Sequence, residues 1–131
     1  MPSFFCDATA RTPEITLDAI AGTLVLTGES YPEDVPSFYA TLTQAIEAYF
    51  AASDGALSVS LKLTYFNSSS ARALMELLDI LDNAASTGRA IMVAWYCDPD
   101  DDITREFAQD ISSEVTHISV QILELEPITP S

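Results

Sequence analysis

A run of alternating residues between positions 57 and 65 places the strongest constraint on the fold of this chain. Apolar residues occupy the odd positions (Leu57, Val59, Leu61, Leu63 and Tyr65), and polar residues occupy the even ones. Successive side chains of a strand point to opposite faces of its sheet. The run therefore predicts a strand that buries one face and leaves the other wet or lightly covered, so we expect helices mainly on one side of the sheet.

The segments on both sides of this run alternate between strand and helix patterns. The first expected elements are strands near 15–17 and 23–27 around a turn at Ala21-Gly22, and a helix from an Asp34 N-cap that ends near Ser53-Asp54-Gly55, where glycine offers a stop. The strand 57–65 comes next, then a helix from the serines at 68–70 to Gly88 and a strand over 90–96. A short helix with Ile103, Phe107 and Ile111 spaced four apart and a strand over 117–123 complete the order. Strand–helix–strand units of this size favour parallel neighbours with right-handed crossovers.

The fold class predicted from this order is α/β (α+β). We expect a small mixed β-sheet of about five strands, in the order β-β-α-β-α-β-α-β, with helices mainly on one face. No internal repeat or linker divides the chain, so a single domain over 1–131 is expected. Residues 1–12 and 126–131 are expected to be loosely ordered.

The charge of the chain excludes several classes of partner. Its 131 residues include 20 Asp and Glu against five Lys and Arg, a formal net charge of −15, while 48% of the residues are hydrophobic. Nucleic acid and anionic membrane surfaces repel such a chain. Basic protein patches attract it, although solubility alone is a simpler explanation of the charge.

The lack of a recognisable targeting signal and the spacing of the cysteines predict a cytoplasmic location. No segment has the length of a membrane span or the pattern of a signal peptide. Cys6 and Cys97 lie far apart, without metal-ligand or CxxC spacing. We therefore expect a cytoplasmic protein with free thiols.

Three consecutive serines, 68–70, follow the alternating strand and directly precede a helix. Backbone N–H groups point outward at a helix N-terminus and the dipole is positive there, so this place tolerates a phosphate. The simpler explanation is that one serine caps the helix and the others are solvated. The functional explanation is phosphorylation, which adds a charge of about −1.5 to −2. Arg72, one turn on, could hold that phosphate by a charge-assisted hydrogen bond.

Phosphorylation at this place would act on an interface more than on the fold. The helix dipole favours an exposed phosphate by only about 0.3–1 kcal/mol. Desolvating the dianion beneath a partner costs more than that, and a penalty of about 2.8 kcal/mol weakens binding about a hundredfold.

Two other groups of polar residues have simpler explanations than chemistry. The acidic run 98–102 has the ligand spacing of a calcium loop, but Ile103 stands where that loop needs glycine and Gln109 where it needs glutamate. His117, the only histidine, has no metal-ligand pattern and suits a sheet edge. No Gly-rich phosphate loop or nucleophile elbow occurs. We therefore expect no cofactor, no metal and no catalytic residue.

The loop over residues 29–33 joins an aromatic residue to two carboxylates. As a contact loop it would offer Tyr31 as an anchor, with Glu29 and Glu33 beside it. As a plain turn before a helix it has no partner, and composition alone favours the plain turn.

Four blocks of the sequence together resemble the SiaC family of bacterial regulatory phosphoproteins. They are Thr12-Pro13-Glu14-Ile15, Gly28-Glu29-Ser30-Tyr31-Pro32-Glu33, Leu63-Thr64-Tyr65-Phe66-Asn67-Ser68-Ser69-Ser70, and Trp95-Tyr96-Cys97-Asp98 followed by acidic residues. The blocks keep the family's order and cover most of the chain. In the family pattern the residue after Asn is Thr; here it is Ser68, which keeps a hydroxyl that can be phosphorylated.

The resemblance implies a fold similar to the STAS domains of anti-sigma-factor antagonists. It also implies reversible phosphorylation of Ser68, with Ser69 and Ser70 as alternatives, by a Ser/Thr kinase, and dephosphorylation by a PP2C-type phosphatase. Asn67 and Arg72 would shape the surroundings of the phosphate. The unphosphorylated form would bind and activate a diguanylate cyclase (a GGDEF protein), raising cyclic-di-GMP and favouring biofilm formation.

We therefore expect a non-catalytic protein whose partner binding is switched by phosphorylation of Ser68. Two alternatives remain open. One is a protein-interaction subunit without a switch. The other is a small hydrolase that uses the serine run, which requires a base near Ser68, and His117 is the only conventional candidate.

Overall fold

The alternating strand lies in the middle of a six-stranded sheet. The structure is a computed structural model that describes residues 3–124. Its elements are β1 (Phe4–Cys6), β2 (Glu14–Asp18), β3 (Thr23–Ser30), α1 (Val35–Ala52), β4 (Leu57–Phe66), α2 (Ser68–Ser86), β5 (Ile91–Cys97), α3 (Asp102–Glu114) and β6 (Ser119–Glu124).

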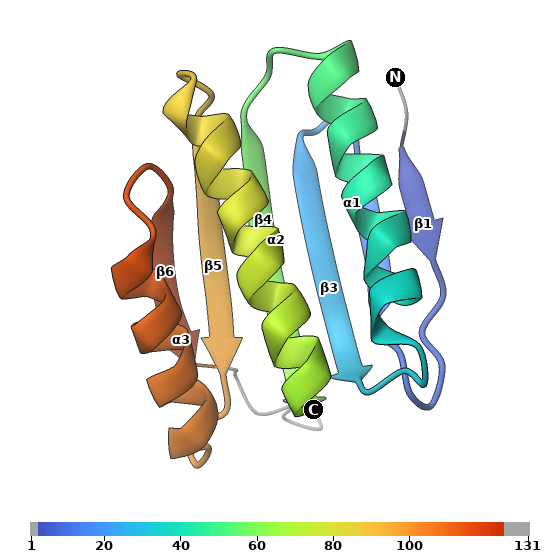
Figure 1. The fold of residues 1–131 in the computed structure, drawn as a ribbon, viewed down its shortest axis with the longest axis vertical. Helices are drawn as coiled ribbons and strands as arrows, with labels where there is room; N and C mark the ends of the chain where they lie inside the picture. The colour runs from blue at the N-terminus through green and yellow to red at the C-terminus, as the bar shows by residue number, and fades with distance from the viewer. Residues whose placement is uncertain (1–2, 125–131) are drawn as a thin grey trace, which may run out of the picture.

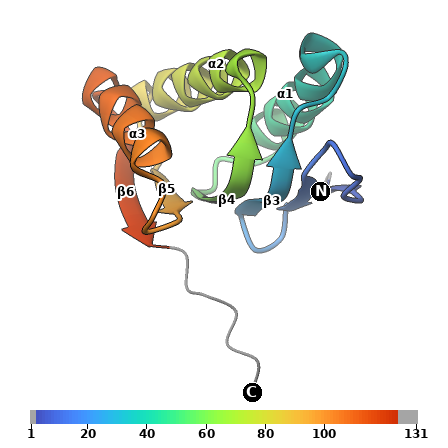
Figure 2. The same ribbon diagram turned by 90° about the horizontal axis from the view of Figure 1, so that it is seen from below.

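The six strands lie side by side in chain order. β1, β2 and β3 pair antiparallel, while β3, β4, β5 and β6 are all parallel. Each pair of consecutive parallel strands is joined by one helix, and all three helices cover the same face of the sheet (Figure 2). The four parallel strands end at one edge, which we call the carboxyl edge, and α1, α2 and α3 all begin there (Figure 1).

The two faces of the sheet differ as the alternation in β4 predicts. Leu57, Val59, Leu61 and Leu63 are buried beneath the helices, each with at most 2% of its surface exposed, but Tyr65, the last residue of the predicted apolar face, is 52% exposed. Ser58, Ser60 and Lys62 of the same strand face the uncovered side, where Met92 of β5 is 61% exposed. The prediction of a sheet covered mainly on one face is therefore confirmed, and so is the mixed α/β class.

The sheet has one strand more than expected, because β1 forms within the segment expected to be loose. Phe4 and Cys6 pair with Leu17 and Ile15 of β2, and both pack against the core. Three residues are too few to show a period, so the strand depends on pairing with β2 rather than on a local signal. The segment 126–131, also expected to be loose, lies outside the described residues.

Turn and helix ends follow local chemistry in most places. Gly22 turns the chain between β2 and β3 with φ +70°, and a Cβ there would lie 2.6 Å from the carbonyl oxygen of Ala56. Asp34 caps α1, its side chain accepting a hydrogen bond from the Ser37 amide. Gly88, with φ +106°, follows the end of α2. These three positions were predicted from the sequence.

Two helix details were predicted wrongly. α1 ends at Ala52 with Ser53 in an extended conformation, its N–H bonded to the Tyr49 carbonyl, so no left-handed glycine is needed at its end. In α3, Ile103 is 82% exposed rather than part of the apolar stripe. The buried side of α3 is formed by Ala108 and Ile111.

Candidate functional site

The three serines form the first turn of α2 rather than a loop in front of it. Asn67 is the N-cap, and its Oδ1 accepts a hydrogen bond from the Ser70 backbone N–H at 2.8 Å. The explanation that one of the serines caps the helix is therefore wrong. Within residues 3–124 the Ser68 hydroxyl has no hydrogen-bond partner, so the fold does not use it.

The side chains of the serine run differ sharply in exposure. Ser68 and Ser69 are exposed, whereas Ser70 has no exposed surface. Successive helical residues are rotated by about 100°, so Ser68 points outward when Ser70 points into the core. A kinase cannot reach a hydroxyl without exposed surface, so the structure disfavours Ser70 as an acceptor and leaves Ser68 and Ser69.

Arg72 lies one helical turn after Ser68, on the same side of α2. Its side chain is exposed and makes no salt bridge with any residue in the described part of the chain. The guanidinium is therefore available to a phosphate on Ser68. Asn67 also adjoins the site, but its side-chain oxygen is already engaged as the helix cap.

A chain of buried hydroxyl groups lies directly beneath this turn. The Tyr39 hydroxyl of α1 lies 2.7 Å from the Ser30 Oγ at the end of β3, and the Ser30 Oγ donates to the Ser70 Oγ at 2.9 Å. Ser30 and Ser70 are fully buried, and Tyr39 is 5% exposed. The sequence analysis missed this hydroxyl chain, because 40 residues separate Ser30 from Ser70 and no local pattern links them.

The segment 29–33, which was predicted as a loop, also lies at the carboxyl edge next to the first turn of α2, but its first two residues, Glu29 and Ser30, belong to β3. The Asn67 N–H donates to the Ser30 carbonyl at 3.1 Å. Tyr31 is half-buried, donates its hydroxyl proton to the Ala10 carbonyl at 2.7 Å and packs edge-on against the Tyr65 ring. These contacts give Tyr31 a structural role, and its role as a partner anchor stays a prediction.

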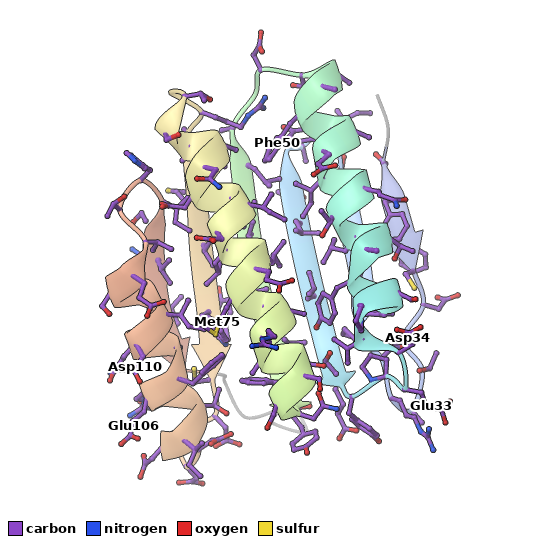
Figure 3. All side chains as sticks on the ribbon, in the orientation of Figure 1. Glu33, Asp34, Phe50, Met75, Glu106 and Asp110 are labelled. Atoms are coloured by element: carbon purple, nitrogen blue, oxygen red, sulfur yellow. The ribbon has the colours of Figure 1, made fainter. Side chains whose placement is uncertain are left out.

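The two carboxylates of this segment stand in different surroundings. Glu33 is exposed and pairs with Arg11 at 2.9 Å. Figure 3 shows Glu33 together with Asp34 at the beginning of α1. Glu29 is exposed in β3, just past a break in register, and pairs with Tyr65 of β4. No contact decides whether either residue binds a partner, so both stay predictions.

A groove of about 710 Å³ runs between the first halves of α1 and α2. Pro32 and Tyr39 line it on one side, and Asn67, Ser69 and Arg72 line it on the other. Of the two exposed serines, Ser69 lines this groove and Ser68 adjoins it in sequence, and the groove is large enough to receive part of another molecule.

The lone histidine lies far from the serine run. His117 lies two residues before Ser119 of β6. Ser119 pairs with Met92 of β5, and Met92 pairs with Ser58 near the start of β4. Ser58 precedes Phe66 by eight residues, which places the two ends of β4 about 26 Å apart at 3.3 Å per residue. His117 is therefore at the opposite end of the sheet and cannot serve as a base for Ser68.

The acidic run 98–102 contains the N-cap of α3, Asp101. The Asp101 side chain accepts hydrogen bonds from the Thr104 hydroxyl and N–H, which hold the pKa of Asp101 below its usual value. Within residues 3–124, no three His, Cys, Asp or Glu side chains are grouped so that they could bind a metal ion. In the same residues, no helix combines the length and apolarity of a membrane span.

The comparisons with known proteins converge on one family. The family model described as "SiaC family regulatory phosphoprotein" matches residues 6–125. An uncharacterized protein of Pseudomonas aeruginosa strain UCBPP-PA14 is 31% identical over 114 residues, which are 87% of this chain and 90% of that protein.

Solved structures of Pseudomonas aeruginosa SiaC share the fold. Apo-SiaC matches with a TM-score of 0.85 at 29% identity, covering 94% of this chain and 99% of that one. SiaC also matches as crystallised with the diguanylate cyclase SiaD, which it activates, with a TM-score of 0.87 at 29% identity over 93% of this chain and 99% of that one. The chain therefore belongs to the SiaC family of regulatory phosphoproteins.

Proposed function

We propose that this chain is a non-catalytic signalling protein that binds and activates a diguanylate cyclase while Ser68 is unmodified, and releases it when Ser68 is phosphorylated. A cytoplasmic Ser/Thr kinase adds the phosphate and a PP2C-type phosphatase removes it. The output is the level of cyclic-di-GMP, and through it biofilm formation. The partner class is supported by the relative SiaC, which is described as the activator of the cyclase SiaD.

The observation that carries the switch is the state of the Ser68 hydroxyl. It is exposed at the first position of a helix that Asn67 already caps, so a phosphate there displaces no contact of the fold. The first-turn N–H groups and Arg72 favour the dianion. A partner that covers the turn must desolvate that dianion, which disfavours binding.

The test compares Ser68→Ala and Ser68→Asp in binding to the diguanylate cyclase of the same organism, measured by calorimetry. The alanine variant is expected to bind as the unmodified chain does, and the aspartate variant to bind at least about tenfold more weakly. A Ser113→Asp variant controls for charge alone, because Ser113 is exposed on α3. Equal affinity of the two Ser68 variants contradicts the proposal.

Ser69→Asp separates the two exposed candidates. If Ser69 is the acceptor, its aspartate variant weakens cyclase binding and Ser68→Asp does not. The fluorescence of Trp95, the single tryptophan, reports whether each variant keeps the native core, because Trp95 is fully buried against Phe66 and Phe107. A further experiment measures the intact mass of the protein after coexpression with its kinase. If no phosphate has been added, the protein is instead an interaction subunit without a switch.

A further inference from the structure

The buried hydroxyl chain beneath α2 does more than fill the core. We propose that Tyr39, Ser30 and Ser70 form a positioning device that fixes the first turn of α2 relative to α1 and β3, and so presents Ser68 to partner proteins at a set place. The inference rests on the function proposed above, because it concerns how the acceptor turn is held for recognition.

The composition of the core supports this role. In the described part of the chain, the only other fully buried side chains with a polar group besides Ser30, Ser70 and the tyrosines are Trp95, with its indole N–H, and Cys97, with its thiol. Burying a hydroxyl is unfavourable unless it is hydrogen-bonded, and a bonded pair adds little net stability over apolar side chains of similar shape. Such groups define the arrangement of the elements they join more than they stabilise it.

The hydrogen bonds around Ser68 hold its neighbours on both sides. Asn67 donates its N–H to the Ser30 carbonyl at 3.1 Å and accepts from the Ser70 N–H at 2.8 Å. The Ser70 side chain is held by the Ser30 Oγ at 2.9 Å. Ser68 lies between these two fixed residues, so its backbone position follows from theirs although its own hydroxyl is unbonded.

Tyr39 extends this anchoring to α1. Burial raises the pKa of its hydroxyl, which keeps the group protonated and able to donate to Ser30. The same side chain lines the groove between α1 and α2. Tyr39 therefore sets the distance between the serine turn and the facing helix, a distance that any protein contacting both must match.

The chain supplies a matched control for this device. Tyr49 lies on the same helix, is 2% exposed, and donates its hydroxyl proton to the Ala56 carbonyl at 2.9 Å. It is near the end of α1, away from the carboxyl edge. Tyr49→Phe therefore removes a partly buried tyrosine hydrogen bond from the same helix without touching the first turn of α2.

The first measurement uses the isolated protein. Amide hydrogen exchange, followed by NMR, is expected to become about three- to tenfold faster at Ser70 and Asn67 in Tyr39→Phe, in line with the loss of one hydrogen bond. Tyr49→Phe is expected to leave both amides within twofold of the wild-type rates. Equal protection of the serine turn in the two variants overturns the proposal.

The second measurement is affinity for the diguanylate cyclase of the same organism. Tyr39→Phe is expected to weaken binding about three- to tenfold, while Tyr49→Phe binds within twofold of wild type. If both variants weaken binding equally, the effect is one of general stability and the positioning role is contradicted. If the wild-type chain itself does not bind the cyclase, the proposed function fails while the exchange measurement still decides the inference.

A double-mutant cycle keeps the test independent of the chosen variant. Ser70→Ala removes the hydroxyl at the far end of the buried hydroxyl chain. It is expected to speed amide exchange at Asn67, as Tyr39→Phe does. Because both residues act through Ser30, the double variant is expected to show less than the product of the two separate fold-changes. Fully multiplicative effects would mean that Tyr39 and Ser70 act independently, which contradicts the proposal.

Discussion

At the scale of single residues, neighbours at the first turn of α2 differ in what they contribute to the fold. Asn67 caps α2, while Ser68 has an exposed hydroxyl that bonds to nothing in the described part of the chain. The sequence predicted the place of this turn and its hydroxyls. It did not predict which residue caps α2, because Asn and Ser are both good helix caps. The residue that keeps an extended backbone just before the helix becomes the cap, and here that residue is Asn67.

The different roles of Asn67 and Ser68 predict different losses of stability. Asn67→Ala is expected to lower the free energy of unfolding by about 1 kcal/mol, the usual loss for a helix cap. Ser68→Ala is expected to change it by less than about 0.5 kcal/mol, as for an exposed side chain without contacts. Urea denaturation followed by Trp95 fluorescence measures both. An equal loss in the two variants would mean that Ser68 shares the capping role.

At the scale of elements, a single carboxylate ties α2 to the turn between α3 and β6. Asp82 accepts hydrogen bonds from the backbone N–H groups of Thr116, His117 and Ile118, the shortest at 2.7 Å. Desolvation by burial acts to raise the pKa of Asp82, but these N–H groups and the charge of His117 outweigh it and hold the pKa below its usual value.

Removal of this carboxylate is expected to destabilise the fold. Asp82→Ala leaves three backbone donors without their partner and should lower the free energy of unfolding by about 1–3 kcal/mol. Asp79→Ala, on an exposed position of the same helix, is the control and should change it by less than about 0.5 kcal/mol.

The same pair of variants tests the pH dependence. Because the folded-state pKa of Asp82 lies below the unfolded one, its contribution is complete above about pH 4 and is lost as the pH falls through the folded pKa. The difference in stability between Asp82→Ala and wild type should therefore shrink in strong acid. A difference that stays constant down to pH 2 would contradict this assignment.

Elements with long periodic patterns were predictable, and those that depend on pairing were not. The alternation in β4 and the helical spacing in α1 and α2 come from the residues themselves. β1 exists because Phe4 and Cys6 find partners in β2, and Ile103 is exposed because α3 turns Ala108 inward instead. Tertiary contacts decide such details, so a single sequence does not contain them.

At the scale of the whole molecule, the parallel arrangement gathers the site at one edge. Because four parallel strands end together, three helix N-termini and the segment 29–33 lie at the carboxyl edge (Figure 1). In the same arrangement His117 lies at the other end of the sheet, so the hydrolase hypothesis has no base near Ser68. The contact between Ser30, Tyr39 and Ser70 depends on this topology, and for that reason it could not be read from the sequence.

The central claim is that one phosphate on Ser68 decides whether the chain binds its cyclase. Its most direct test is the cyclase affinity of chain homogeneously phosphorylated at Ser68, compared by calorimetry with the unmodified chain. The account predicts that the phosphate weakens binding about a hundredfold while Trp95 fluorescence stays native. Phosphorylated and unmodified chains that bind the cyclase with equal affinity would contradict it.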